Sequence, residues 1–248
     1  MPPRDLRSPS ADGIWTSRRS FIILIGCLLS AGDIDSTVPS AAMVIEPVTL
    51  HTADGLALEA ELSVPEADAW ATAVLAHPHP TFGGTMRSIV PGTLFAALPP
   101  AGVIALRFNF RGVEGSEGTF GDGRTETADI VAAIDAVWSI AEGLPLMLAG
   151  WSFGADTSLA VVDGRVSGWL AVAPPLRRPE DMVAVAADAR PKLLAVPEHD
   201  QYRSPDSAAD VVAGWTTTEL RVVKGADHFL VGRVDRVAEW ALDFARAL

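Results

Sequence analysis

The sequence predicts one α/β domain with a mostly parallel sheet, an antiparallel hairpin at its start and helices on both faces. Two runs with strand-like alternation are joined by Ala53-Asp54-Gly55, and an Asp-Gly pair is typical of a hairpin turn. From residue 71 onward, short apolar runs alternate with helical segments, which is the pattern of repeated βα units. The chain has 248 residues and is 49% hydrophobic, so it can bury one substantial core.

The individual elements follow from their hydrophobic patterns. Residues 44–52 and 56–64 alternate like the half-buried strands of a hairpin, whereas residues 71–76 are apolar throughout, as expected of a strand covered on both faces. Further strands are predicted at residues 103–110, 146–149, 168–173, 192–196 and 219–223, and helices at residues 86–98, 124–140, 155–162, 179–189, 205–214 and 232–248. The segment between residues 173 and 192 is too short for a cap domain.

Residues 1–42 differ from the predicted domain, which spans residues 43–248. Two arginines precede an apolar run at residues 21–32, which has the length of the apolar part of a signal peptide and is too short to cross a bilayer comfortably. Four interpretations are open: a twin-arginine export signal with cleavage at residues 40–42, a lipoprotein signal at Cys27, a retained anchor, and a translation start at Met43. We favour the start at Met43, which predicts a cytoplasmic protein, with twin-arginine export as the alternative. Membrane contact is expected only if the N-terminal segment is retained.

Charge and cysteine content exclude several function classes. The net charge is −12 at pH 7, so most of the surface would repel a polyanion, and nucleic acid is not an expected partner. Cys27 is the only cysteine, which excludes an internal disulfide and a cysteine-rich metal site. We expect no cofactor, and the oligomeric state stays open.

The stretch Gly150-Trp151-Ser152-Phe153-Gly154 carries the clearest chemical signal. It fits the pattern Gly-x-Ser-x-Gly, with an apolar strand before it and a helical run after it. In such a strand-turn-helix elbow the serine adopts a strained conformation that exposes its hydroxyl, and the two glycines let strand and helix approach closely. Ser152 is therefore the candidate nucleophile, and the alternative is a glycine-rich turn with no catalytic role.

A serine hydroxyl needs a base, and the base needs an orienting carboxylate. Because ligands of parallel sheets bind beyond the carboxyl ends of the strands, residues that directly follow strands are the candidates. His228 follows the last predicted strand and Asp200 follows the one before it, so they are predicted as base and acid. Other carboxylates compete for the role of acid: Glu198 above all, then Asp206 and Asp181.

An oxyanion formed by attack on a carbonyl needs two N–H donors. One is predicted to be the backbone N–H of Phe153, which follows the nucleophile, and the other is expected from the loop after the strand at residues 71–76. In that loop Pro78 and Pro80 have no N–H, which leaves His79 as the second donor and Thr81 in reserve.

Two further motifs admit other interpretations. His77 and His79 could form a metal pair, but further ligands are scarce, so we expect no metal site. Polar residues of the stretch RFNFRGVEGSEG at residues 107–118 are expected to brace a turn, with Arg111 as a minor candidate for binding a substrate carboxylate.

These motifs together resemble those of the α/β-hydrolase superfamily, and in particular the small, lidless bacterial serine hydrolases related to dienelactone hydrolases. The matching stretches run in family order: HPHPTFGGTM at residues 77–86, RFNFRGVEGSEG at 107–118, GWSFG at 150–154, residues 198–200, and GADHF at 225–229. The resemblance covers residues 43–248 and includes the chain order serine, acid, histidine. One departure lies at Pro197, where relatives often have glycine, so the acid loop is the weakest part of the match.

The resemblance implies an α/β-hydrolase fold without a cap domain and a serine hydrolase activity. The expected function is that of a carboxylesterase on small or accessible esters, with Ser152, His228 and Asp200 as a catalytic triad and an acyl-enzyme intermediate. A non-catalytic binding scaffold with this fold, an acyltransferase and a peptidase are the alternatives, and the natural substrate stays open.

Overall fold

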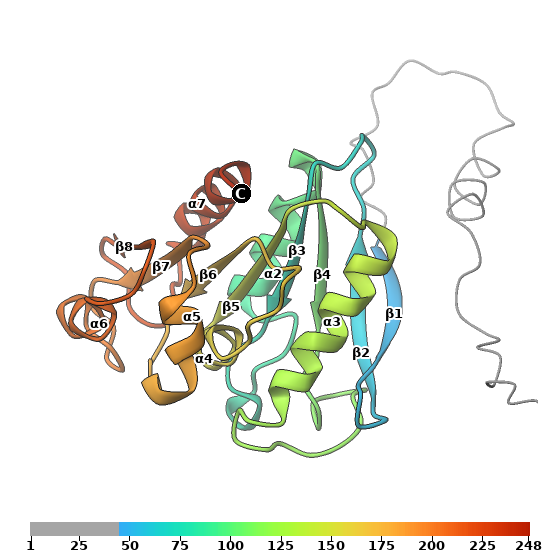
Figure 1. Ribbon diagram of the computed structural model, residues 1–248, viewed down its shortest axis with the longest axis horizontal. Helices are drawn as coiled ribbons and strands as arrows, with labels where there is room; N and C mark the ends of the chain where they lie inside the picture. The colour runs from blue at the N-terminus through green and yellow to red at the C-terminus, as the bar shows by residue number, and fades with distance from the viewer. Residues whose placement is uncertain (1–44) are drawn as a thin grey trace, which may run out of the picture. The chain divides into compact units, whose positions relative to one another are not determined.

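The computed structural model describes residues 45–248, and the predictions made for residues 1–42 lie outside this part of the chain. An eight-stranded sheet with the order β1-β2-β4-β3-β5-β6-β7-β8 forms the centre of the fold (Figure 1). The strands are β1 (Ile45–His51), β2 (Ala57–Ser63), β3 (Ala71–Ala76), β4 (Val103–Phe108), β5 (Leu146–Trp151), β6 (Gly168–Val172), β7 (Lys192–Pro197) and β8 (Thr218–Val223).

The helices connect these strands and cover both faces of the sheet. They are α2 (Ile89–Ala97), α3 (Glu126–Ile140), α4 (Phe153–Leu159), α5 (Val183–Ala187), α6 (Pro205–Val212) and α7 (Val234–Arg246), with short 3₁₀ turns η1 (Pro80–Phe82), η2 (Pro99–Ala101) and η3 (Pro179–Met182). Among residues 45–248, no helix has the length and apolar character that a membrane crossing would require.

The predicted fold is confirmed. β1 and β2 pair antiparallel with Leu50 opposite Leu58, and the Asp-Gly pair turns the chain between them. β2 also runs antiparallel to β4, whereas the pairs from β4 through β3 to β8 are parallel. Because parallel central strands are covered on both faces, every residue of β3, β5, β6 and β7 is buried, which explains their unbroken apolar runs.

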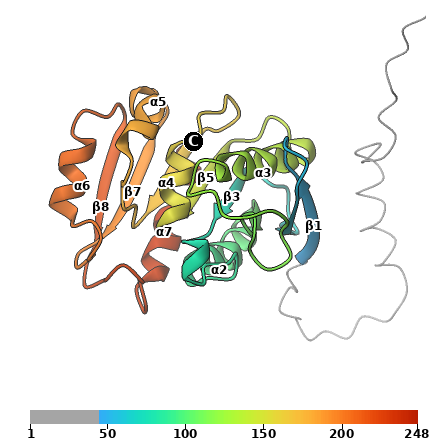
Figure 2. The ribbon, with the colours of Figure 1, turned by 90° about the horizontal axis from the view of Figure 1, so that it is seen from below.

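Two hydrophobic cores lie on opposite faces of the sheet. Side chains of α3, α4, α5 and α6 belong to one core, and those of α2 and α7 belong to the other. Figure 2 shows α2 and α7 on one side of the strands and α3 and α5 on the other. No cap domain separates β6 from β7, where only η3 and the five residues of α5 intervene, so the carboxyl ends of the central strands are left uncovered.

Several element boundaries differ from the predicted ones. The helix after the elbow begins at Phe153, not at residue 155, because the chain turns into it directly at Ser152. The first helix begins at Ile89, three residues later than predicted, since the preceding residues form turns in which the hydroxyl of Ser88 accepts the N–H of Thr85. β4 ends at Phe108, two residues before the predicted end of the strand. The N–H of the next residue, Asn109, donates to the carbonyl of Glu59.

Candidate active site

Ser152 lies in the sharp turn between β5 and α4, where its backbone has φ 54° and ψ −116°. This positive φ is costly for a residue with a side chain, and it is sustained by the close packing of the strand and helix on either side. A Cβ atom added to Gly154 would lie 2.5 Å from the carbonyl oxygens of Ala76 and His77, and one added to Gly150 would clash with the backbone of Gly154. Only glycine fits at either position, so the elbow pattern follows from this packing.

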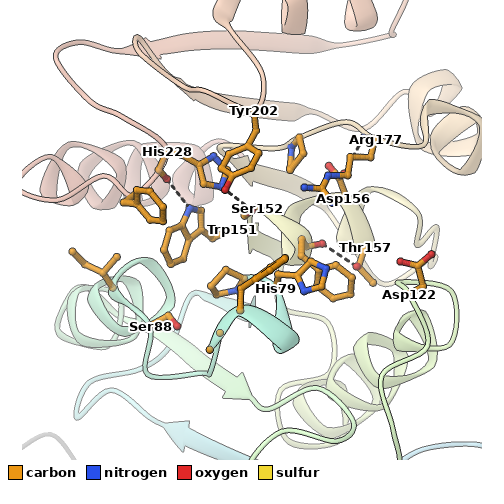
Figure 3. A pocket seen from close by; sticks show the side chains of 18 of the residues that line it. His79, Ser88, Asp122, Trp151, Ser152, Asp156, Thr157, Arg177, Tyr202 and His228 are labelled. Carbon is orange, nitrogen blue, oxygen red and sulfur yellow. Dashed lines mark hydrogen bonds between the residues drawn. The ribbon is translucent and has the colours of Figure 1, made fainter.

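The structure brings Ser152, His228 and Asp200 into one hydrogen-bonded line (Figure 3). The Ser152 Oγ lies 2.8 Å from His228 Nε2, and His228 Nδ1 lies 2.8 Å from Asp200 Oδ2. An ionised carboxylate only accepts hydrogen bonds, so Nδ1 carries the proton and Nε2 is left to accept one from the serine. The side chains of His228 and Asp200 are 6% and 1% exposed, which keeps water from competing for this bond.

The Asp200 carboxylate is held by its own loop. Its Oδ1 accepts the backbone N–H groups of Tyr202 and Arg203, at 2.8 and 3.1 Å, which leaves Oδ2 for the histidine. The Arg203 guanidinium in turn donates to the carbonyls of Pro175 and Leu176, after β6. The loop that presents the acid is thereby tied to the neighbouring loop of the sheet.

Two of the other carboxylates considered for the acid have other partners, and the third, Asp206, lies in the first turn of α6. Glu198 accepts the Lys224 ammonium and the Gly225 N–H, at 2.9 and 2.8 Å, on the surface. Asp181 pairs with Arg178, at 3.2 Å. Asp200 is therefore the carboxylate that the structure places against His228.

Aromatic side chains fix the His228 ring from several sides. The Trp151 indole N–H donates to the carbonyl of His228 at 3.2 Å. The rings of Tyr202 and Phe229 lie edge-on to the imidazole, with centroid distances of 4.4 and 5.8 Å. Sequence reasoning did not single out Tyr202 or Trp151 for this role, although Trp151 is the second residue of the elbow pattern and its position was a usable signal.

Phe153 and His79, whose backbone N–H groups are the predicted oxyanion donors, are both residues that line the pocket with Ser152. Phe153 is the first residue of α4, so its N–H has no partner within the helix. Within residues 45–248, the N–H of His79 donates to no other protein group. The imidazole of His79 packs against the Phe153 ring, with centroids 5.1 Å apart, which brings the two residues together. Burial lowers the pKa of His79, and the positive charge of Arg177 lowers it further.

The sequence did not define the role of His77, whereas the structure shows which groups its ring binds. Its Nδ1 donates to the carbonyl of Pro78 at 2.6 Å and its Nε2 accepts the N–H of Phe110 at 3.0 Å, so both ring nitrogens are occupied by backbone groups. The ring is fully buried, and burial lowers the pKa of His77 to about 4. His77 therefore joins the loops that follow β3 and β4 as a neutral imidazole.

The residues around Arg111 brace the turn after β4, as expected. Arg111 donates to the buried carboxylate of Asp129 and to Asp54, and its side chain is 5% exposed. The suggestion that Arg111 binds a substrate carboxylate is wrong, because its guanidinium is occupied by two acids and does not line the pocket.

The serine opens into a pocket of about 850 Å³ at the carboxyl ends of the strands. Trp151, Ser152, Tyr202, His228 and Phe229 line one part of it. The remaining lining residues are Pro78, His79, Phe82, Gly83, Gly84, Ser88, Ile89, Asp122, Phe153, Asp156, Thr157, Pro175, Arg177 and Arg178. Sequence reasoning missed Asp156 and Arg177, which no motif marks.

Comparison with known proteins shows which proteins this fold resembles. A structure from Coxiella burnetii, described as an alpha-beta serine hydrolase homologue, is 31% identical, covers 86% of this chain and 100% of its own, and superposes with a TM-score of 0.73. The chain belongs to the α/β-hydrolase superfamily. A superfamily member from Xanthomonas campestris, described as a serine hydrolase without a lid, is 27% identical with a TM-score of 0.74 over 86% of this chain and 97% of that one.

Two further comparisons concern curated proteins and models of protein families. An uncharacterized protein of Rickettsia prowazekii is 29% identical over 69% of this chain and 77% of its own length. No family model matches the sequence. The similarity to serine hydrolases supports the expected enzyme class, a hydrolase, and agrees with the missing cap domain.

Proposed function

We propose that the protein is a carboxylesterase that hydrolyses small or accessible esters through an acyl-enzyme on Ser152. The observation that carries the proposal is the hydrogen-bonded line from Ser152 through His228 to Asp200, with 2.8 Å at each step, at the wall of an open pocket. A scaffold without turnover has no chemical need for this arrangement of a strained serine, a base and a buried acid.

In the proposed reaction Ser152 Oγ attacks the carbonyl carbon of the ester while His228 Nε2 takes the hydroxyl proton. The protonated imidazole is stabilised by Asp200 and then gives its proton to the oxygen of the leaving alcohol, which departs. A water molecule, deprotonated by the same nitrogen, attacks the acyl-enzyme and releases the acid. Serine, histidine and aspartate return to their starting protonation states.

The negative charge that develops on the carbonyl oxygen needs donors that are already in place. The backbone N–H groups of Phe153 and His79 are the proposed pair, because both residues line the pocket and neither N–H donates to another protein group within residues 45–248. The His77 bridge to Phe110 supports the loop that carries the His79 amide.

The shape of the pocket supports esters over substrates that need a closed site. The carboxyl ends of β5 to β7 have no cap, and the pocket of about 850 Å³ can hold acyl and alcohol groups of several sizes. Such an open site is expected to turn over activated esters with modest selectivity for chain length.

The test is covalent labelling of the full chain with a fluorophosphonate, read by intact mass and peptide mapping, beside hydrolysis of p-nitrophenyl butyrate. We expect one adduct on Ser152 and a kcat that falls by about 10⁴-fold or more in Ser152→Ala and in His228→Ala. Absence of both labelling and turnover in the folded protein would contradict the esterase and favour the binding scaffold. Butyrate transferred to an added alcohol in preference to water would favour an acyltransferase.

A further inference from the structure

Of the two arginines that line the pocket, Arg177 is the one that makes no ion pair within residues 45–248. It lies in the loop between β6 and η3, its side chain is exposed and it lines the pocket. Within residues 45–248 its guanidinium makes no ion pair and no hydrogen bond, and its one hydrogen bond is made by its backbone N–H. The adjacent Arg178 is paired with Asp122 and Asp181.

The backbone of this loop is fastened to the elbow helix. Asp156, in the first turn of α4, accepts the N–H of Leu176 at 2.9 Å and the N–H of Arg177 at 3.0 Å. Asp156 lies four residues after Ser152, which is the N-cap residue of the same short helix, so the backbone of Arg177 is held in position relative to the proposed nucleophile. The free guanidinium is thus carried on a backbone that the catalytic elbow itself holds.

The electrostatic setting leaves the positive charge of Arg177 available to a ligand. The protein as a whole carries a net charge of −12. Of the acids of the pocket, Asp122 pairs with Arg178. Asp156 accepts two backbone N–H groups and makes no ion pair with Arg177, although burial raises the pKa of Asp156 and the nearby charge of Arg177 opposes that rise. The charge of Arg177 also lowers the pKa of His79, so its field reaches the loop of the proposed oxyanion donors.

The two sides of Ser152 differ in chemistry. Figure 3 shows Trp151 and His228 on one side of Ser152, and Arg177 with Asp156 and Thr157 on the other. The rings of Tyr202 and Phe229 contact His228, so the histidine side is aromatic. Since His228 must protonate the leaving oxygen, the leaving alcohol belongs on the aromatic side, and the acyl portion extends toward Arg177.

We propose that Arg177 binds a negatively charged group on the acyl portion of the substrate, which makes the preferred substrates esters of dicarboxylic or similarly anionic acids. The guanidinium offers paired N–H donors that match a carboxylate, and such charge-assisted bonds are stronger than neutral ones. This inference rests on the proposed esterase function and specifies its substrate class.

The experiment compares two esters with the same leaving group and the same acyl length, p-nitrophenyl valerate and mono-p-nitrophenyl glutarate, on the full chain. The measured quantity is the ratio of kcat/KM for the anionic ester to kcat/KM for the neutral one. We expect Arg177→Gln to lower this ratio about tenfold and Arg177→Lys to lower it less, because lysine keeps the charge but not the paired donors. Arg236→Gln removes an equal charge from the exposed face of α7 and should leave the ratio unchanged.

Salt provides a second readout that a purely structural role of Arg177 would not change. Raising the ionic strength should lower the ratio in the wild type and leave it nearly constant in Arg177→Gln, because only the wild type has the attraction that salt screens. An equal ratio in wild type and Arg177→Gln would overturn the inference. So would an Arg177-dependent preference for a charge on the leaving side, measured with the valerate ester of 4-hydroxybenzenesulfonate.

Failure of the esterase function itself would give a different result. If the neutral ester is hydrolysed in a Ser152-dependent way, the proposed function stands, and the ratio alone decides on Arg177. If neither ester is hydrolysed, the proposed function fails, and the binding of glutarate, measured by calorimetry, decides on the anion site. Glutarate should then bind the wild type about tenfold more tightly than Arg177→Gln, and equal affinity would overturn the site.

Discussion

The buried imidazole of His77 should make the free energy of unfolding depend on pH. The neutral ring donates to Pro78 and accepts from Phe110, and it packs edge-on against the Phe110 ring with centroids 4.8 Å apart. Protonation would place a second N–H against that of Phe110 and would charge a fully buried ring. Burial accordingly lowers the pKa of His77 to about 4, from an ordinary value of 6.5.

The sign and size of the effect follow from linkage. Between pH 6.5 and pH 4 the unfolded chain binds a proton at this position and the folded protein does not, so the free energy of unfolding decreases as the pH falls. With these two pKa values, the loss contributed by His77 between pH 8 and pH 5 is about 2 kcal/mol. The variant His77→Gln keeps an oxygen that can accept from Phe110 but cannot titrate.

The assay is urea unfolding of wild type and His77→Gln at pH 8 and pH 5, with the free energy of unfolding taken by linear extrapolation. We expect the wild type to lose about 2 kcal/mol more than the variant over this interval. Asp156, whose pKa burial raises to about 6, changes stability in the opposite direction, but it is present in both proteins and cancels in the comparison. An identical pH dependence in the two proteins would refute the assignment of His77 as a buried neutral bridge.

Two more predictions concern the acid of the proposed triad and the ion pair after β4. Asp200→Asn should lower kcat for p-nitrophenyl butyrate by about 10³- to 10⁴-fold, because the histidine would no longer be held with Nε2 free to accept the serine proton. The control variant Glu198→Gln should change kcat by less than about twofold, and a similar loss of kcat in both variants would contradict the choice of Asp200. Asp129→Ala should lower the free energy of unfolding by about 3 kcal/mol and the Tm by about 10 °C, because it removes a buried partner of Arg111. The control variant Asp135→Ala breaks an exposed pair with Arg165 and should lower the free energy of unfolding by less than about 1 kcal/mol. Equal small losses of Tm in the two variants would contradict the structural role of Arg111.

These experiments test a site whose parts were predictable to different degrees. The candidate nucleophile was marked by a local pattern, because a strained serine between a strand and a helix requires glycines two residues on either side. His228 was marked by its place after the last strand. No motif marked Arg177, since an exposed arginine beside another arginine is common in charged loops, and only the fold places it in the pocket that Ser152 also lines.

The sequence by itself determined the order and approximate bounds of the strands and helices, the fold class and the short set of residues that could act as nucleophile, base and acid. It could do so because the apolar runs of the strands, the Asp-Gly turn and the Gly-x-Ser-x-Gly pattern can each be recognised within a short stretch of the chain. Only the tertiary structure shows that Asp200, and not Glu198 two residues before it in the same loop, lies against His228. The choice depends on Lys224 and Gly225 holding one carboxylate at the surface while His228 meets the other, and these contacts join residues more than twenty positions apart.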